Sequence, residues 1–199
     1  EQLGSNPGGK YKDASGNEYY IKQYSDVDQA HTEIASQKVY EALGIKVPKS
    51  KVIGDGSLVT PWEKVQPFLT SKDLRDELTA DPEQAARLYA AAMLTENWDH
   101  VGLEFDNMVM GFDGKLTVID HGGAFTYRAQ GKKKAYTPDA AEWESFADNS
   151  IAPQTQKVFQ DVIKNPVFLK TLKKVLGDVV PSSDTYKNIP GVDWHDIDA

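Results

Sequence analysis

The sequence predicts an α+β protein with a β-rich N-terminal lobe, residues 1–66, and a helical C-terminal lobe, residues 67–199. Strand-forming runs and glycine-containing turns dominate the N-terminal part, helical periodicity dominates the C-terminal part, and a strong hairpin signal lies inside the latter. A chain of 199 residues with 40% hydrophobic content can bury one core or two small lobes that share a cleft. We therefore expect one or two compact units.

The N-terminal part predicts strands around a single helix. Residues 10–24 carry strand-forming Tyr and Ile residues beside the turn 14–17, which indicates a hairpin. Residues 28–43 have apolar side chains at helical spacing, start with an acidic residue and end before Gly44, which predicts a helix. Two short strands are expected next, at 47–53 and 57–60, and then a connector at 61–67.

The C-terminal part predicts helices on both sides of one hairpin. Residues 82–97 have Pro in the first turn and an Ala-rich body, which favours a helix. Asp113-Gly114 is a strong two-residue turn signal between two apolar runs. With this pair at the centre of the turn, Asn107 lies opposite Asp120. Further helices are expected at 139–149, 152–164 and 166–177.

Composition argues against several classes of protein. A net charge of −8 and a single short basic run, 132–134, disfavour a general binder of the nucleic-acid backbone, which needs clustered cations. No apolar run is long enough to cross a membrane, and the first residues lack the pattern of a signal peptide. The absence of Cys excludes disulfides and thiolate metal sites. We expect no nucleic-acid partner, no membrane insertion and a cytoplasmic location.

Polar side chains stand at both open ends of the predicted hairpin. In the predicted register Asn107 faces Asp120, and directly opposed residues have Cβ atoms roughly 4.5 to 5.5 Å apart. Oxygen ligands of this kind suit Mg²⁺, which takes its other ligands from water and substrate phosphates. A purely structural interpretation is equally open, because Asp106 and Asn107 could end one strand and Asp120 could begin a loop.

A glycine-rich stretch near the N-terminus points to phosphate binding. Residues 4–10, GSNPGGK, begin like a P-loop, but Tyr11 replaces the hydroxyl that would bind Mg²⁺, and a hairpin follows instead of a helix. In kinases a glycine-rich turn between strands covers the ATP phosphates, and a strand Lys pairs with a helix Glu. Lys22 and Glu33 occupy such positions, although each by itself could be an ordinary solvated charge.

The order of these features through residues 3–128 resembles the protein-kinase-like fold. It is most similar to the HipA-like and phosphatidylinositol-3/4-kinase-like branch, and within it to small domains of phage and bacterial effector proteins. The resemblance rests on four sequence segments, GSNPGG, YYIK, NWDHVGLEFDN and IDHGGAFTYRAQG. It implies a bilobal kinase-like fold, ATP and Mg²⁺ bound between the lobes, and transfer of phosphate to a Ser or Thr hydroxyl of a protein. It also implies a second possibility for the location, namely that the protein is an effector delivered out of the cell that makes it.

The resemblance implies a role for each candidate residue by its position. Lys22 would contact the α- and β-phosphates and pair with Glu33. Asp99 would accept the proton of the substrate hydroxyl, and Asn107 and Asp120 would hold Mg²⁺, which makes Asp120 catalytic as well. The glycine-rich turn would cover the nucleotide through Gly4, Ser5, Asn6, Gly8 and Gly9.

Two positions depart from the family pattern. The pattern places the catalytic Asp five residues before the metal-binding Asn, whereas Asp99 is eight residues before Asn107. Either the loop carries a three-residue insertion that Gly102 accommodates, or Asp106 takes part of the role. We favour Asp99, because Asp106 should project to the face opposite Asn107. His121 replaces the Phe of the Asp-Phe-Gly motif.

Three functions fit these residues. They are a kinase, a nucleotide-binding pseudokinase that serves as an interaction module, and an enzyme that transfers AMP on the same fold. The joint presence of Lys22, Asn107 and Asp120 favours catalysis, and the spacing of Asp99 weighs against it. Arg128 is either a substrate or phosphate contact or part of a structural ion pair, and the basic run 132–134 is interpreted as a solvated loop.

Overall fold

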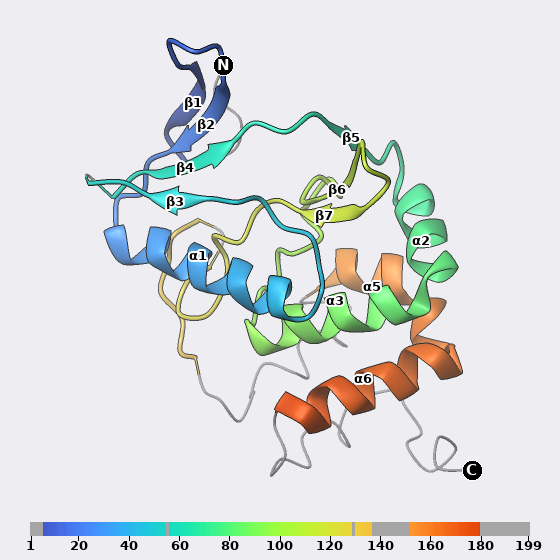
Figure 1. The fold of residues 1–199 in the computed structure, drawn as a ribbon. Helices are drawn as coiled ribbons and strands as arrows, with labels where there is room; N and C mark the ends of the chain where they lie inside the picture. The colour runs from blue at the N-terminus through green and yellow to red at the C-terminus, as the bar shows by residue number, and fades with distance from the viewer. Residues whose placement is uncertain (1–5, 55, 129, 137–151, 180–199) are drawn as a thin grey trace.

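The computed structural model describes residues 6–54, 56–128, 130–136 and 152–179. These residues form a mixed α/β structure with two antiparallel sheets. The first sheet has the strand order β1-β2-β4-β3 and the second β5-β6-β7. In Figure 1 the first sheet lies above α1, and α3 and α6 lie below it.

The elements follow the chain in this order. The N-terminal elements are β1 (Gly8–Lys12), β2 (Glu18–Lys22), α1 (Val27–Ala42), β3 (Lys51–Val52) and β4 (Leu58–Pro61). The middle of the chain forms β5 (Val65–Pro67), α2 (Ser71–Ala80), α3 (Pro82–Leu94), β6 (Met108–Gly111) and β7 (Leu116–Val118). The last elements are α5 (Pro153–Phe159), the 3₁₀-helix η1 (Val162–Lys164) and α6 (Pro166–Val179).

The predicted N-terminal hairpin and helix are confirmed. β1 pairs with β2 so that Gly8 lies opposite Lys22, the last residue of β2. Asp26 caps α1, because its side chain accepts a hydrogen bond from the N–H of Asp28. The strand expected at 47–53 is shorter than predicted, since only β3 is paired there. This geometry places the end of β2 next to the start of α1.

Sequence reasoning missed two elements between β4 and α3. α2 begins after Thr70, whose hydroxyl accepts a hydrogen bond from the N–H of Asp73, and it buries Leu74 and Leu78. A Thr followed three residues later by an acid is a recognisable helix start. β5 lies inside the expected connector and pairs with β6, so the connector joins the second sheet.

The hairpin formed by β6 and β7 is one residue out of the predicted register. The loop between them spans three residues, 112–114, and the third has a φ of +72°. Loops of this length with a left-handed third residue are a common alternative to the two-residue turn. Asn107 therefore lies opposite Ile119, whose N–H donates to the Asn107 carbonyl oxygen at 3.0 Å. The prediction that Asn107 faces Asp120 is wrong.

The predicted Ala-rich helix is confirmed as α3, and it lies at the centre of the core. It packs against α1, α2 and α6, and its small side chains allow these neighbours to approach closely. Tyr89 of α3 has its ring 5.0 Å from that of Phe159 and 5.8 Å from that of Phe168. The helix expected at 152–164 is divided into α5 and η1, and the one expected at 139–149 lies outside the described residues. No helix in the described ranges is long and apolar enough to cross a membrane.

Candidate functional site

Three charged residues from distant parts of the chain meet beside the first sheet. The Nζ atom of Lys22, at the end of β2, lies 3.5 Å from Glu33 Oε2 on α1 and 3.2 Å from Asp120 Oδ1 after β7. The Glu33 side chain is 2% exposed and that of Lys22 is 12% exposed, while the Asp120 carboxylate is 42% exposed. The ammonium group is thus held between a buried carboxylate and one that is only partly exposed.

The three groups set one another's protonation. Burial by itself would lower the pKa of Lys22, but the charges of Glu33 and Asp120 raise it well above its usual value. Burial raises the pKa of Glu33, against the opposing effect of Lys22. Burial also acts to raise the pKa of Asp120, but Lys22 and a backbone N–H together bring it below its usual value. Lys22 is therefore cationic and Asp120 anionic at neutral pH.

A second layer of contacts orients these groups. The hydroxyl of Tyr24 donates to Glu33 Oε2, and the N–H of Gly122 donates to Asp120 Oδ1 at 3.0 Å. A Cβ atom on Gly122 would lie 2.8 Å from the Tyr24 hydroxyl, so no larger residue fits there without a shift. Sequence reasoning missed Tyr24, although it follows Lys22 by two residues, the spacing of side chains that share one face of an extended chain.

His121, which replaces the Phe of the motif, connects the second sheet with α1. Its Nδ1 atom lies 3.1 Å from Ser36 Oγ, its Nε2 atom 3.1 Å from the Val118 carbonyl oxygen, and its ring 4.6 Å from that of Tyr40. Burial lowers the pKa of His121 to about 4, so the ring is neutral. His121 therefore serves to position α1, and with it Glu33, relative to the chain that carries Asp120.

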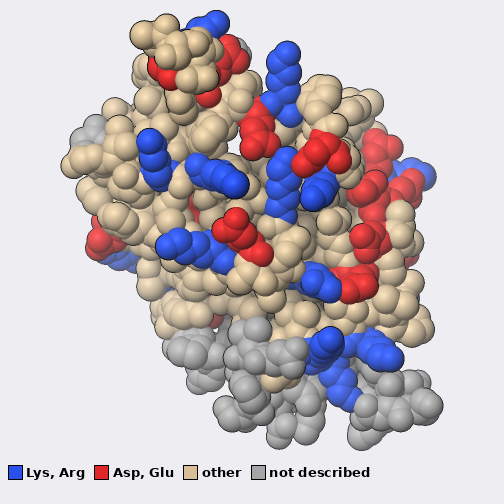
Figure 2. Space-filling model, viewed as in Figure 1, with Lys and Arg blue, Asp and Glu red and all other residues tan. Residues whose placement is uncertain are grey.

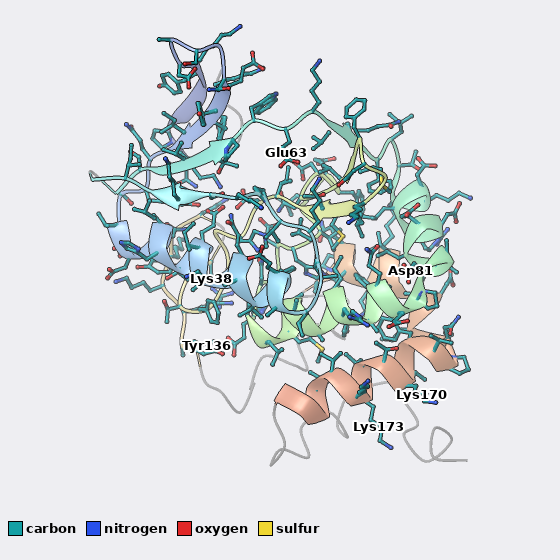
Figure 3. All side chains as sticks on the ribbon, viewed as in Figure 1. Lys38, Glu63, Asp81, Tyr136, Lys170 and Lys173 are labelled. Carbon is teal, nitrogen blue, oxygen red and sulfur yellow. The ribbon has the colours of Figure 1, made fainter. Side chains whose placement is uncertain are left out.

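A cleft of about 240 Å³ opens beside Lys22. Its polar lining includes Lys22, Glu33, Asp106, Asn107 and Asp120. Its other walls are largely apolar and aromatic and include Tyr20, Pro48, Leu58, Trp62, Val65 and Ile119. Glu63, labelled in Figure 3, also lines the cleft, in the segment between β4 and β5. Asn107 and Asp120 thus share one cavity although they are not opposed in the hairpin.

The loop before β6 brings Asp99 next to Asn107. The Nδ2 group of Asn107 donates to the Asp99 carbonyl oxygen at 2.6 Å. Gly102 has a φ of +80°, and a Cβ atom there would lie 2.3 Å from Asp106 Oδ1, so the loop folds tightly around this glycine. Burial, followed by the charges of Asp120 and Asp106, raises the pKa of Asp99 to about 6. A carboxylate with this pKa is suited to accept a proton near neutral pH.

The structure places Asp106 differently from the expectation. Asp106 lines the same cleft as Asn107 and Asp120, whereas its side chain was expected on the opposite face. The residue precedes β6, so the alternation of a strand does not govern its direction. Asp99 lines a separate pocket instead.

The donor set in the cleft fits a Mg²⁺ ion of the kind that binds with substrate phosphates. Both contacts of the Asp120 carboxylate described above go to Oδ1, and the Asn107 amide donates through Nδ2 to the backbone. Asp120 Oδ2 and Asn107 Oδ1 are consequently the oxygens that would hold the ion. No three His, Asp or Glu side chains gather as a metal cluster in the described part of the chain.

The glycine-rich stretch is described only from Asn6 onward, so Gly4 and Ser5 lie outside the described residues. Gly8 and Gly9 lie in β1, where a Cβ atom on Gly8 would come within 2.3 Å of the Ile21 carbonyl oxygen. Asn6, Gly8 and Gly9 do not line the cleft. Their role in covering phosphates stays a prediction.

The comparisons with known proteins are sparse. No protein-family model matches the chain, and no curated protein matches it. Among solved structures, the choline kinase LicA from Streptococcus pneumoniae is similar over 99% of this chain and 88% of that chain, with 13% sequence identity and a TM-score of 0.39. A likeness this weak carries no information on function. The chain is a mixed α/β protein with an antiparallel N-terminal sheet. Its chemistry is therefore inferred from the residues of the site.

Proposed function

We propose that this protein is an ATP- and Mg²⁺-dependent phosphotransferase with a protein-kinase-like site, which moves the γ-phosphate of ATP to a hydroxyl. One observation carries the proposal: Lys22 at the end of a strand pairs with buried Glu33 of the following helix and reaches Asp120 after the hairpin. A strand Lys that pairs with a helix Glu, opposite a metal-binding Asp, is the phosphate-binding arrangement of kinases.

The cleft offers separate places for the base and the phosphates. Tyr20, Leu58 and Trp62 provide apolar and aromatic surface for the adenine ring. Lys22 provides the positive charge for the α- and β-phosphates, and Glu33 keeps its ammonium group in place. Asp120 and Asn107 would hold Mg²⁺, which when bound neutralises charge on the phosphate oxygens.

Asp99 is the proton acceptor of the proposed reaction. The hydroxyl oxygen of the acceptor forms a bond to the γ-phosphorus, and the bond from that phosphorus to the β–γ bridging oxygen breaks. The hydroxyl proton passes to the Asp99 carboxylate, and ADP leaves with the electron pair of the broken bond. Asn107 holds the Asp99 backbone in place through its hydrogen bond of 2.6 Å, so the metal-binding and proton-accepting groups keep a constant spacing.

The finer assignments belong to the same proposal and are supported by sequence motifs. They comprise the HipA-like and phosphatidylinositol-3/4-kinase-like branch, a division into lobes at residues 66 and 67, and a Ser or Thr hydroxyl of a protein as acceptor. The glycine-rich turn that begins at Gly4 and Ser5 is assigned to the phosphates on the same grounds. Transfer of AMP and a catalytically inactive nucleotide-binding role are the competing outcomes of the experiment below.

The test uses ATP labelled separately at the γ- and the α-phosphate, with Mg²⁺ and the full chain. Label that transfers from the γ-position only, and is lost in Asp120→Ala and Lys22→Ala, supports the proposal. Lys170→Ala is the matched control, because this exposed lysine lies on α6, as Figure 3 shows, and does not line the cleft. Label from the α-position would instead show transfer of AMP.

Binding is measured in parallel by thermal unfolding. Mg-ATP at about 100 times its dissociation constant should add about 2.7 kcal/mol to the free energy of unfolding, which corresponds to a rise in Tm of roughly 5 to 10 °C. Binding without transfer of either label would identify a nucleotide-binding module. A Tm that millimolar Mg-ATP leaves unchanged would refute every nucleotide hypothesis.

A further inference from the structure

A second pocket is lined by Asp99, whose carbonyl oxygen accepts a hydrogen bond from the cleft residue Asn107. Its cavity measures about 370 Å³, which is large enough for a small ligand or one side chain of a peptide. Trp98, Asp99, Arg128, Lys132 and Lys134 are among the residues that line it. Because Asp99 stands at this pocket while its neighbour Asn107 lines the cleft, an acceptor bound in the pocket would reach the proposed proton acceptor.

Protein cations already cover the ring of Trp98. The guanidinium carbon of Arg128 lies 4.5 Å from the ring centroid and the Nζ atom of Lys134 lies 5.3 Å from it. The Lys134 ammonium also donates to the Glu96 carbonyl oxygen, which fixes it at the pocket wall. The ring of Trp98 therefore already contacts two cations of the protein. These two side chains bring positive charge to the pocket.

Backbone hydrogen bonds hold Arg128 and Lys132, which both line the pocket, close together. The N–H of Arg128 donates to the Lys132 carbonyl oxygen at 2.7 Å, and the N–H of Gly131 donates to the Arg128 carbonyl oxygen at 2.9 Å. Neither side chain forms an ion pair with another described residue, and both are exposed. The middle lysine of the run is different, because Lys133 forms an ion pair with Asp26 at 3.1 Å. The interpretation of the run 132–134 as a merely solvated loop is therefore too simple.

The charges that line the pocket are strongly unbalanced. Arg128, Lys132 and Lys134 supply three positive charges, and Asp99 is the acidic residue among the described lining residues. The chain as a whole carries a net charge of −8, so the positive charge of the described pocket lining is opposite in sign to that of the whole chain. On the face drawn in Figure 2, by contrast, basic and acidic side chains are interspersed. A local excess of cations beside one carboxylate is suited to an anionic ligand.

We propose that this pocket binds the acceptor, and that the acceptor carries a phosphate or carboxylate group close to the hydroxyl that is phosphorylated. Arg128 and Lys132 bind the anionic group, and the apolar side chain of Leu103 contacts the carbon skeleton. The hydroxyl then lies toward Asp99, which takes its proton. The proposal rests on the proposed phosphotransferase function and deepens it, because it assigns Arg128 to the substrate.

The first experiment compares acceptors of similar size and different charge. Formation of ADP from Mg-ATP is measured with glycerol 3-phosphate, glycerol or choline, and with serine peptides in which Glu, Ala or Lys flanks the serine. We expect at least tenfold more turnover with the anionic probe of a series than with the neutral one, and none above background with the cationic one. Preference within the peptide series identifies a protein acceptor, and preference confined to glycerol 3-phosphate identifies a small molecule.

Variants connect this preference to the pocket. Arg128→Ala and Lys132→Ala should each raise the KM for the anionic probe about tenfold, because each removes one charge-assisted contact. The KM for ATP should stay unchanged, since neither residue lines the nucleotide cleft. Lys170→Ala is the charge-matched control and should change neither value. Equal turnover of anionic, neutral and cationic probes, or a preference for the cation, overturns the proposal while the phosphotransferase function stands.

A binding measurement separates the two proposals if no ADP forms. The indole N–H of Trp98 reports on the pocket in ¹⁵N NMR spectra, and its signal is assigned with Trp98→Phe. Glycerol 3-phosphate should shift this signal, Arg128→Ala should weaken the effect about tenfold, and choline should leave it in place. This result without catalysis would support the anion site and refute the reaction. If no ADP forms, a Trp98 signal that neither glycerol 3-phosphate nor the Glu-flanked peptide shifts overturns the anion site.

Discussion

Replacement of Lys22 by Met tests the buried charge pair without any assumption about catalysis. Met keeps most of the length and apolar surface of the side chain but removes the ammonium group. Glu33, whose side chain is 2% exposed, then loses the cation 3.5 Å away and keeps only the hydroxyl of Tyr24 as a described side-chain partner. Asp120 also loses its ion pair, but its carboxylate is 42% exposed and can be solvated.

The expected magnitude follows from the burial of Glu33. Removal of one partner of a buried pair typically costs 3 to 5 kcal/mol, and the exposed pair with Asp120 adds about 1 kcal/mol at most. We take about 3 kcal/mol, because the Tyr24 hydroxyl still stabilises the Glu33 carboxylate. In a chain of this size this corresponds to a fall in Tm of roughly 6 to 12 °C at pH 8.

The penalty should depend on pH with a definite sign. Burial already raises the pKa of Glu33 above its ordinary value of 4.5, and loss of Lys22 raises it further. A group whose pKa is higher in the folded state than in the unfolded state stabilises the fold at low pH, and this contribution is lost as the pH rises through the folded value. The variant should therefore be least destabilised near pH 5 and most destabilised near pH 8.

Thermal unfolding of four proteins at pH 5 and pH 8 provides the assay. The wild type, Lys22→Met, Glu33→Gln and the double variant form a double-mutant cycle. The double variant should recover most of the stability that Lys22→Met loses at pH 8, because a neutral amide replaces the stranded carboxylate. An equal loss at both pH values, or no recovery in the double variant, would show that Glu33 is not the buried partner of Lys22.

Three further predictions concern the rest of the site and the fold. Asp99→Asn should lower the rate of phosphate transfer about 10²- to 10⁴-fold with little change in the binding of Mg-ATP. The wild-type rate should rise with pH through an apparent pKa of about 6. A flat pH profile contradicts the role of Asp99. Gly122→Ala should cost about 1 to 3 kcal/mol in urea unfolding, whereas the control Gly54→Ala, where nothing lies within 4 Å of the added Cβ atom, should cost little. Thr70→Ala should cost about 1 kcal/mol through loss of the α2 cap, and an unchanged unfolding midpoint would show that the cap is not needed.

Local patterns predicted much of the fold. The N-terminal hairpin, α1 and α3 follow from turn residues, capping and periodicity, which depend on neighbours in the chain. α2 carries the same kind of signal in Thr70 and Asp73, so its omission reflects an unread capping motif rather than a tertiary effect. The division of the segment 152–164 into α5 and η1 had no comparably strong local signal.

The hairpin shows where local reasoning reaches its limit. Asp113-Gly114 is compatible with a two-residue and a three-residue loop, and the two choices differ by one residue in register. A shift of one residue moves every side chain of a strand to the other face. Packing of the apolar face of β7 against the core decides between the two, with Leu116 and Val118 buried. The loop that carries Asp99 and Asp106 depends in the same way on tertiary contacts around Gly102.

The sequence by itself determined the order of most elements, with α2 and β5 as exceptions, and it identified Lys22, Glu33 and Asp120 as candidate residues. Both results rest on local patterns and spacing. Only the tertiary structure decided that these three side chains meet, that Tyr24 bonds to Glu33, and that Asp99 stands at a pocket of its own. Distances between side chains from separate elements depend on how sheets and helices pack, and no local pattern records that packing. The contacts of Arg128 and Lys134 with the Trp98 ring likewise depend on this packing, so only the structure shows them.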